Sequence, residues 1–203
     1  MIEDFIEEND KNKIKKILQD ISFLTVDKQT TKKFLGNFHV MMERPRYENF
    51  IFKKSIKPKI VSPYYDYFLG LVNKFCKKHG LKYKKVIRAS LNKTYHIPDY
   101  IHGDPHIDFF VDHIVFLLYL SNSDVSSTLV FDKVQKFDGK KNWYESPKTF
   151  PIIKEVFPSF GKIFAFNGRY YHTNIHPAVG EDRIVCVFNL LIDKPWYRYL
   201  GYC

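Results

Sequence analysis

Cysteine is scarce in this sequence of 203 residues. Its three cysteines, Cys76, Cys186 and Cys203, are an odd number, lie far apart and include no CxxC pair. This spacing indicates neither a disulfide framework nor a thiolate zinc site, so we expect a reducing compartment. Long apolar runs are also missing. No stretch reaches the about 18 apolar residues of a membrane-spanning helix, and residues 1–12 are acidic rather than basic and apolar. We therefore expect a soluble, cytoplasmic protein that does not enter a membrane.

Large apolar side chains are plentiful. Hydrophobic residues make up 45% of the sequence, which is enough to bury a core without disulfides. Aromatic residues reach 17%, mostly Phe and Tyr, and such flat side chains favour the faces of β-sheets. We expect a single domain over residues 1–203 that is mainly β with flanking helices.

The formal net charge of +10 raises the question of nucleic acid, because a basic surface attracts phosphates. The lysines are spread over several segments instead of one. These segments are Lys11–Lys16, Lys53–Lys59, Lys77–Lys85 and Lys133–Lys148. Such a spread is typical of a solvated surface, and a nucleic-acid-binding surface is the alternative that the charge leaves open.

Two helices are expected in the first part of the chain. The apolar residues of Ile2–Ile21 recur at near-helical spacing among charged ones, which predicts an amphipathic helix on the outside of a sheet. A second helix has Ser62 as its cap, Pro63 in its first turn and Gly80 as its stop signal. Residues 1–85 are therefore expected to be a largely helical supporting region.

Short apolar strands separated by turn residues follow. The expected strands are Val86–Leu91, Ile114–Leu120, Thr128–Phe131, Lys162–Phe166 and Ile184–Ile192. They predict a sandwich or jelly-roll core over residues 86–192, with a helical layer on one side. The polar segment Gln135–Thr149 is expected to be a surface loop that can form a lid, and residues 193–203 an aromatic C-terminal tail on the helices.

The sequence His106-Ile107-Asp108 carries the most specific chemistry. Residues two apart in a strand face the same side, so this motif presents an imidazole nitrogen and a carboxylate oxygen to one point. A third ligand from a distant strand would complete a two-histidine, one-carboxylate set, which leaves three positions open on iron(II), and His172 is well placed to be this ligand. Arg183 begins the last strand, and a buried guanidinium there suits bidentate capture of a carboxylate.

These candidates have competitors. His102 and Asp104 form a second HxD pair, but Pro105 follows it, so this pair is expected before the strand rather than within it. His176 competes with His172 because the two share parity along the chain.

In their order and spacing, these motifs resemble the iron(II)/2-oxoglutarate-dependent oxygenase superfamily. The match is closest to its prolyl-hydroxylase-like branch, including short members often found in viruses, and covers roughly residues 86–191. It rests on the HxD motif, Tyr119–Asp124, Thr128–Phe131, Gly161–Phe166, His172, Pro177 and Arg183. The resemblance implies a double-stranded β-helix (a cupin-like jelly roll), Fe(2+), 2-oxoglutarate as co-substrate, and O2.

By this resemblance, His106, Asp108 and His172 are the iron ligands. Arg183 binds the distal carboxylate of 2-oxoglutarate, and Tyr119 resembles the strand tyrosine that hydrogen-bonds the same group. A position in the core is the alternative for Tyr119.

Three nearby features bear on the same pocket. Val185 stands where some members of the branch have Ser or Thr, which makes a contact from Tyr119 more necessary. Val125-Ser126-Ser127 stands where the branch usually has glycines. Arg88 and Asn92 are expected to contact the co-substrate or the substrate backbone, with a structural hydrogen-bond network as the alternative.

Arg183 also has an alternative role, as a surface ion-pair partner of Glu181 or Asp182.

The activity implied by the resemblance is hydroxylation of an unactivated carbon, with 2-oxoglutarate decarboxylated to succinate. A peptidyl proline in a peptide or protein is the leading substrate. The alternatives are the same chemistry on a nucleobase or small metabolite, and a non-catalytic jelly-roll binding module. A viral member would act in the cytoplasm of its host cell.

Overall fold

The computed structural model describes most of the chain. The described residues are 1–25, 36–43, 58–99, 101–134 and 150–192. The expected loop Gln135–Thr149 and the expected tail, residues 193–203, lie outside them. Of the helices in the described ranges, none combines the length and the hydrophobicity that crossing a bilayer requires.

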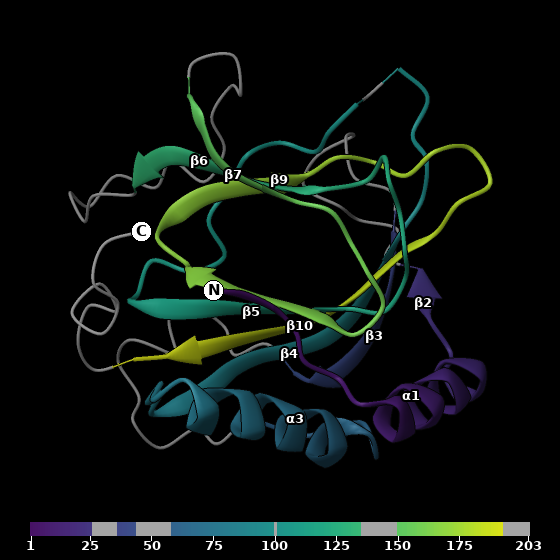
Figure 1. Cartoon of the computed structure of the whole chain (residues 1–203), viewed down its shortest axis with the longest axis vertical. Helices are drawn as coiled ribbons and strands as arrows, with labels where there is room; N and C mark the ends of the chain where they lie inside the picture. Colours follow the sequence, from purple (N-terminus) through teal and green to yellow (C-terminus); the bar gives the residue numbers. More distant parts are fainter. Residues whose placement is uncertain (26–35, 44–57, 100, 135–149, 193–203) are drawn as a thin grey trace.

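Two antiparallel sheets form the β-structure of the described residues. The larger has the strand order β1-β8-β5-β10-β4-β3-β2 and the smaller the order β7-β6-β9. The elements are β1 (Ile2–Asp4), α1 (Glu8–Asp20), β2 (Leu24–Thr25), β3 (Gly36–Met42), α3 (Tyr65–Lys78), β4 (Lys85–Thr94), β5 (His113–Tyr119), β6 (Thr128–Val134), β7 (Ile152–Val156), β8 (Lys162–Asn167), β9 (Tyr170–Asn174) and β10 (Arg183–Leu191). The smaller sheet covers one face of the larger, and α1 and α3 lie on the other (Figure 1). The expected architecture, mainly β with flanking helices, is confirmed.

The second expected helix is present as α3. The Ser62 hydroxyl accepts a hydrogen bond from the Tyr64 backbone N–H (3.2 Å) just before the helix, and Gly80 follows it with φ of 64°. The apolar side of α3 packs on the large sheet, where the Phe75 and Phe116 rings meet edge to face at 5.4 Å. The apolar stripe and the glycine stop therefore located this helix, but the expected cap is wrong: Tyr64 is the N-cap and Pro63 lies before the first turn.

The helix expected over Ile2–Ile21 is wrong at its beginning. Ile2–Asp4 form β1, which pairs with β8, and the Met1 ammonium donates a hydrogen bond to the Ala165 carbonyl at 2.8 Å. Strands β2 and β3 also lie in residues 1–85, so this region is less helical than expected. An edge of an existing sheet satisfies backbone groups that a helix terminus would leave without partners, and a local pattern does not report such distant partners.

All five expected strands are present, as β4, β5, β6, β8 and β10. Strands β7 and β9 were not expected. Strand β9 is short and ends in three successive polar residues, so it lacks the alternating apolar pattern that identifies a strand. This omission matters because β9 contains His172.

Strand β10 presents side chains on both faces of the large sheet. Alternate residues face opposite sides, so Arg183, Val185 and Asn189 share one face of the strand. Phe188 is on the other face, where its ring lies 6.0 Å from that of Tyr65 in α3. Arg183 and Asn189 therefore point toward the smaller sheet.

Candidate metal centre

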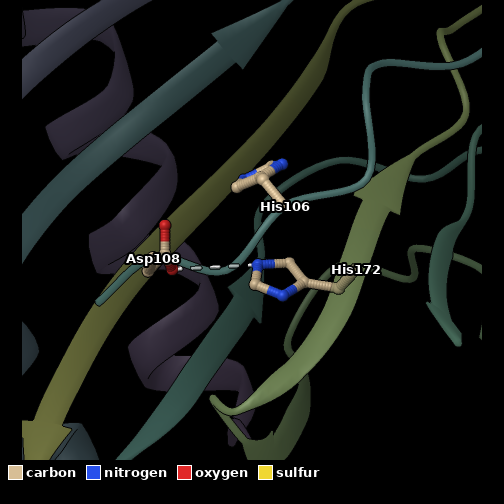
Figure 2. Close-up of side chains that lie close together, drawn as sticks. All are labelled: His106, Asp108 and His172. Atoms are coloured by element: carbon tan, nitrogen blue, oxygen red, sulfur yellow. Dashed lines mark ion pairs between the residues drawn. The ribbon is translucent and has the colours of Figure 1, made fainter. Parts of the chain in front are cut away.

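Three side chains that can bind a metal ion meet between the two sheets. His106, Asp108 and His172 each offer one ligand atom, and these atoms all lie within 4.8 Å of one another. The His172 ring is directed at the Asp108 carboxylate, with 3.8 Å between Nε2 and Oδ2 (Figure 2). Neighbouring ligands of one ion lie about 3 Å apart, so small side-chain rotations suffice to close the set around a metal. The structure thus brings together the three expected ligands.

Backbone pairing holds the two histidines opposite each other. The His106 N–H donates to the His172 carbonyl (3.0 Å), and the His172 N–H donates back to the His106 carbonyl (2.9 Å). The expectation that His106 and Asp108 lie in a strand is wrong, because this single bridge is the only ladder contact of the motif within the described residues. Instead Ile107, 1% exposed, is buried in a second apolar cluster with Tyr171. Burial of Ile107, rather than a regular ladder of strand hydrogen bonds, therefore holds the motif in position.

Both histidines are prepared to bind a metal through Nε2. His106 Nδ1 lies 2.9 Å from the Asp104 carbonyl, and His172 Nδ1 lies 3.1 Å from the Tyr170 carbonyl. A carbonyl oxygen only accepts, so each Nδ1 carries the proton and each neutral ring keeps its lone pair on Nε2. Burial, and then the neighbouring His106, lower the pKa of His172 from 6.5 to about 4. His172 is therefore neutral near pH 7, as a metal ligand must be.

Both oxygens of Asp108 accept hydrogen bonds. Arg88 Nη1 donates to Oδ1 (2.9 Å), and Asn189 Nδ2 donates to Oδ2 (2.8 Å). Arg88, expected to contact the co-substrate or the substrate, thus contacts a candidate metal ligand. Asn189 was not expected at the site. Its signal is a fully buried amide in an otherwise apolar strand, six residues after Arg183 and therefore on the same face.

Arg183 is buried between the sheets, with 6% of its surface exposed. Its Nη2 donates to the Thr128 hydroxyl (2.7 Å), and its guanidinium carbon lies 5.6 Å from the centre of the Tyr119 ring. Burial lowers the pKa of Arg183 below its ordinary value and raises that of the Tyr119 phenol. A guanidinium remains charged nevertheless, so a full cation lies in an apolar setting.

The surface ion pairs considered for Arg183 are not formed. Asp182 pairs with Lys93 at 2.6 Å, and Glu181 accepts a hydrogen bond from Ser123 at 3.2 Å. Within the described residues, Arg183 has no carboxylate partner, and its Nε has no hydrogen-bond partner. The arrangement leaves a donor for an anionic ligand.

Thr128 is a second residue that sequence reasoning missed as part of the site. Its hydroxyl accepts hydrogen bonds from Tyr119 (2.7 Å) and from Arg183. A hydroxyl has two acceptor positions and one proton, so Thr128 retains its proton for a further partner. Asn92 lies on neighbouring β4, where its Oδ1 accepts a hydrogen bond from Ser90 at 2.8 Å. The signal that could have identified Thr128 is its own position, buried at the start of strand β6.

The competing histidines lie apart from this group. His102 Nδ1 bonds to the Gly103 carbonyl (2.9 Å), and Asp104 contributes its backbone carbonyl to His106. His176 is buried, yet neither it nor His102 belongs to a three-residue ligand group in the part of the chain that the structure describes.

Comparison with known proteins gives a clear answer at the level of structure. No family model and no curated protein matches the sequence. The chain is similar to an oxidoreductase of the 2OG-Fe(II) oxygenase family from Burkholderia pseudomallei, with a TM-score of 0.63, 13% identity, and coverage of 92% of this chain and 80% of that one. The chain has the fold of the 2OG-Fe(II) oxygenases. The expected jelly-roll core is thereby confirmed.

Two other solved structures show how varied proteins of this fold are. The α-ketoglutarate-dependent epimerase SnoN from nogalamycin biosynthesis has a TM-score of 0.59 and 10% identity, over 94% of this chain and 77% of that one. A prolyl hydroxylase from Trichoplax adhaerens, solved with a peptide fragment of the hypoxia-inducible factor, has a TM-score of 0.54 and 10% identity, over 94% and 82%. At such identities the likeness concerns the fold alone.

Proposed function

We propose that the chain is an iron(II)- and 2-oxoglutarate-dependent oxygenase that hydroxylates an unactivated carbon of its substrate. The observation that carries this proposal is the presence of two features between the two sheets. A His-Asp-His group can hold a metal, and a buried guanidinium without a carboxylate partner in the described residues can hold an anion. A dicarboxylate that also chelates the metal satisfies both.

His106, Asp108 and His172 would hold the iron through Nε2, Oδ2 and Nε2. The two rings are neutral ligands, and Asp108 supplies the single negative charge. Iron(II) with 2-oxoglutarate and O2 supplies the oxidation, in which 2-oxoglutarate loses carbon dioxide and becomes succinate while the substrate carbon gains a hydroxyl.

Arg183 would bind the distal carboxylate of 2-oxoglutarate, with Thr128 donating its free proton to the same group and Tyr119 fixing the Thr128 hydroxyl. Val185 and Val187 follow Arg183 on the same face of β10 and are 1% and 5% exposed. These valines form an apolar floor that suits the methylene groups of the co-substrate. Asn92 on β4 lies directly across from Val185, so its amide nitrogen is a further candidate contact.

The leading substrate is a peptidyl proline. The similarity to a prolyl hydroxylase solved with a peptide supports a peptide, although the similarity to SnoN keeps a small metabolite as the alternative. Two lysines of α1 and α3 pair with acidic side chains: Lys11 with Glu8 (3.7 Å) and Lys74 with Asp10 (3.7 Å). The net charge of +10 keeps nucleic acid as a second alternative.

The test of the chemistry is a succinate-release assay with iron(II) and 2-oxoglutarate across peptide, nucleic-acid and metabolite panels. We expect release by the parent protein and none by Asp108→Ala. Asp104→Ala is the matched control, because it removes the carboxylate of the competing HxD pair, and it should retain activity. Iron binding by Asp108→Ala at the parent affinity would refute the site. Failure of every panel to stimulate release would favour the binding module.

Salt separates the two macromolecular substrates. Binding that neutralises phosphates weakens steeply as salt rises, whereas a peptide held by apolar contacts and backbone hydrogen bonds responds weakly. We expect stimulation by a proline-containing peptide that changes little between low and physiological salt. A steep salt dependence with single-stranded DNA or RNA, together with a hydroxylated base, would replace the peptide as substrate.

A further inference from the structure

Asn174 is a polar residue on the inner face of the smaller sheet. It follows His172 by two residues in β9, so both side chains leave the strand on the same side. His172 points toward Asp108 (Figure 2), and Asn174 therefore also faces the larger sheet. Two residues of a strand span about 7 Å, so Asn174 lies one step along β9 from a candidate metal ligand.

The pairing of β9 with β6 leads to the same placement. Asn174 is the register partner of Thr128. One residue further along, the Ile175 N–H donates to the Ser127 carbonyl at 2.9 Å. This bond makes Thr128 and Asn174 a non-hydrogen-bonded pair, in which the Cα atoms lie about 4.5 Å apart and the side chains are close. Asn174 is thus next to the hydroxyl that accepts a hydrogen bond from Arg183 at 2.7 Å.

The Asn174 amide has few partners for a half-buried group. Its single hydrogen bond within the described residues runs from Nδ2 to the carbonyl of the next residue, Ile175, and its length of 3.4 Å makes it weak. Among the same residues, the second Nδ2 proton and Oδ1 have no partner. Polar groups on the inner face of a sheet normally find one. Asn174 therefore offers a donor to a ligand in the space between the sheets.

Thr128 and Asn174 are neighbouring donors that do not bond each other. The Thr128 hydroxyl accepts hydrogen bonds from Arg183 and Tyr119 and keeps its own proton. Although both strands are described, no hydrogen bond joins Thr128 to Asn174. An O–H and an N–H group beside a buried guanidinium suit one shared anion, because a carboxylate has about four acceptor positions on its two oxygens. The distal carboxylate of 2-oxoglutarate is the anion that the proposed function brings to this point.

We propose that Asn174 is a further co-substrate-binding residue, whose Nδ2 donates a hydrogen bond to the distal carboxylate beside Arg183 and Thr128. This inference rests on the proposed function. Asn174 is a neutral donor, so it adds a hydrogen bond while Arg183 alone balances the charge. A purely structural role of Asn174 would affect every ligand of the site alike, whether or not the ligand has a distal carboxylate.

The test compares two ligands on the protein loaded with Co(II), whose visible absorption reports binding without turnover. 2-Oxopentanoate has the metal-chelating end of 2-oxoglutarate but a methyl group in place of the distal carboxylate. Asn174→Ala should bind 2-oxoglutarate about 10- to 100-fold more weakly than the parent, the loss expected for a hydrogen bond to a charged group, and 2-oxopentanoate as weakly as the parent does. Asn174→Asp has the same shape but repels a carboxylate, so it should lose more 2-oxoglutarate affinity than Asn174→Ala.

Asn37→Ala is the matched control. Asn37 donates to the Tyr95 hydroxyl at 3.0 Å and is the register partner of Lys93, so it lies on the opposite face of the larger sheet, and its loss should leave both affinities unchanged. Asn174→Leu replaces Asn174→Ala if the latter does not fold, as judged by circular dichroism. Parent affinity of the Asn174 variant for 2-oxoglutarate, or an equal loss for both ligands, overturns the role of Asn174. A parent protein that shows no metal-dependent binding of 2-oxoglutarate refutes the proposed function instead.

Discussion

Replacing Arg183 with methionine should separate stability from ligand binding. The guanidinium is buried, donates to Thr128 at 2.7 Å, and has no carboxylate partner in the described residues. Removing a buried cation that lacks a counter-ion relieves a desolvation cost, and an apolar side chain of similar length fills the space. Without ligand, we expect Arg183→Met to be at least as stable as the parent protein.

Binding of 2-oxoglutarate should change in the opposite direction. Loss of a buried, charge-assisted partner costs on the order of 2 to 5 kcal/mol. At about 1.4 kcal/mol for each tenfold, the dissociation constant should rise about 30-fold to about 4,000-fold. Arg183→Lys should recover only part, because an ammonium does not match the two carboxylate oxygens as a planar guanidinium does. Metal affinity should be nearly unchanged.

Thermal unfolding with saturating metal, with and without 2-oxoglutarate, measures both effects. A ligand at about 100 times its dissociation constant stabilises the parent by about 2.7 kcal/mol, and the same concentration should stabilise Arg183→Met by about 0.9 kcal/mol or less. The reasoning is refuted if Arg183→Met is strongly destabilised without ligand and yet gains the full stabilisation with it. Arg183 would then be a structural residue.

Two further predictions concern the scaffold. A Cβ at Gly168 would lie 2.0 Å from Nε2 of buried His113, so Gly168→Ala should lower the free energy of unfolding by on the order of 1 to 3 kcal/mol. A Cβ at Gly70 in α3 would have no atom within 4 Å, so Gly70→Ala should be neutral or stabilising by up to about 1 kcal/mol. Chemical denaturation of both variants checks this, and equal stability would contradict it. The Lys78 hydrogen bond holds the pKa of Glu3 below its ordinary value of 4.5, so its stabilising contribution exists above that pH and is lost as the pH falls through the lowered pKa. Glu3→Gln should therefore be less stable than the parent by about 1 kcal/mol or less near pH 7, and this difference should shrink as the pH falls through the lowered pKa; a difference that does not shrink in acid would contradict the assignment.

Local patterns in the sequence were enough to place much of this chain. The stripe and end signals of α3, and the apolar strands such as β5 and β10, depend on nearby residues, so periodicity reports them directly. The parity of His106 and Asp108 likewise put two candidate ligands on one side of the backbone. The regular strand expected there was not required, because burial of Ile107 orients the two flanking side chains in an irregular segment as well.

Only the tertiary structure decided which distant groups meet. The β1 strand depends on an edge of β8, and the approach of His172 depends on a single backbone bridge to His106. Neither partner is visible in the local sequence of the other, because strand register is set by packing across the whole sheet.

The same limit applies to the partners of the charged groups. The sequence indicated that Arg88 and Arg183 belong to the site, but it left their partners open: a structural network for Arg88, and Glu181 or Asp182 for Arg183. Strand register then placed Arg88 opposite Asn189 and directed both to Asp108, while Arg183 is buried with a hydroxyl partner and with an Nε that has no hydrogen-bond partner in the described residues. Residue type and spacing thus determined the kind of chemistry. The pairing of β4 with β10 decided which side chains come into contact, since contact energies act in space and not along the chain.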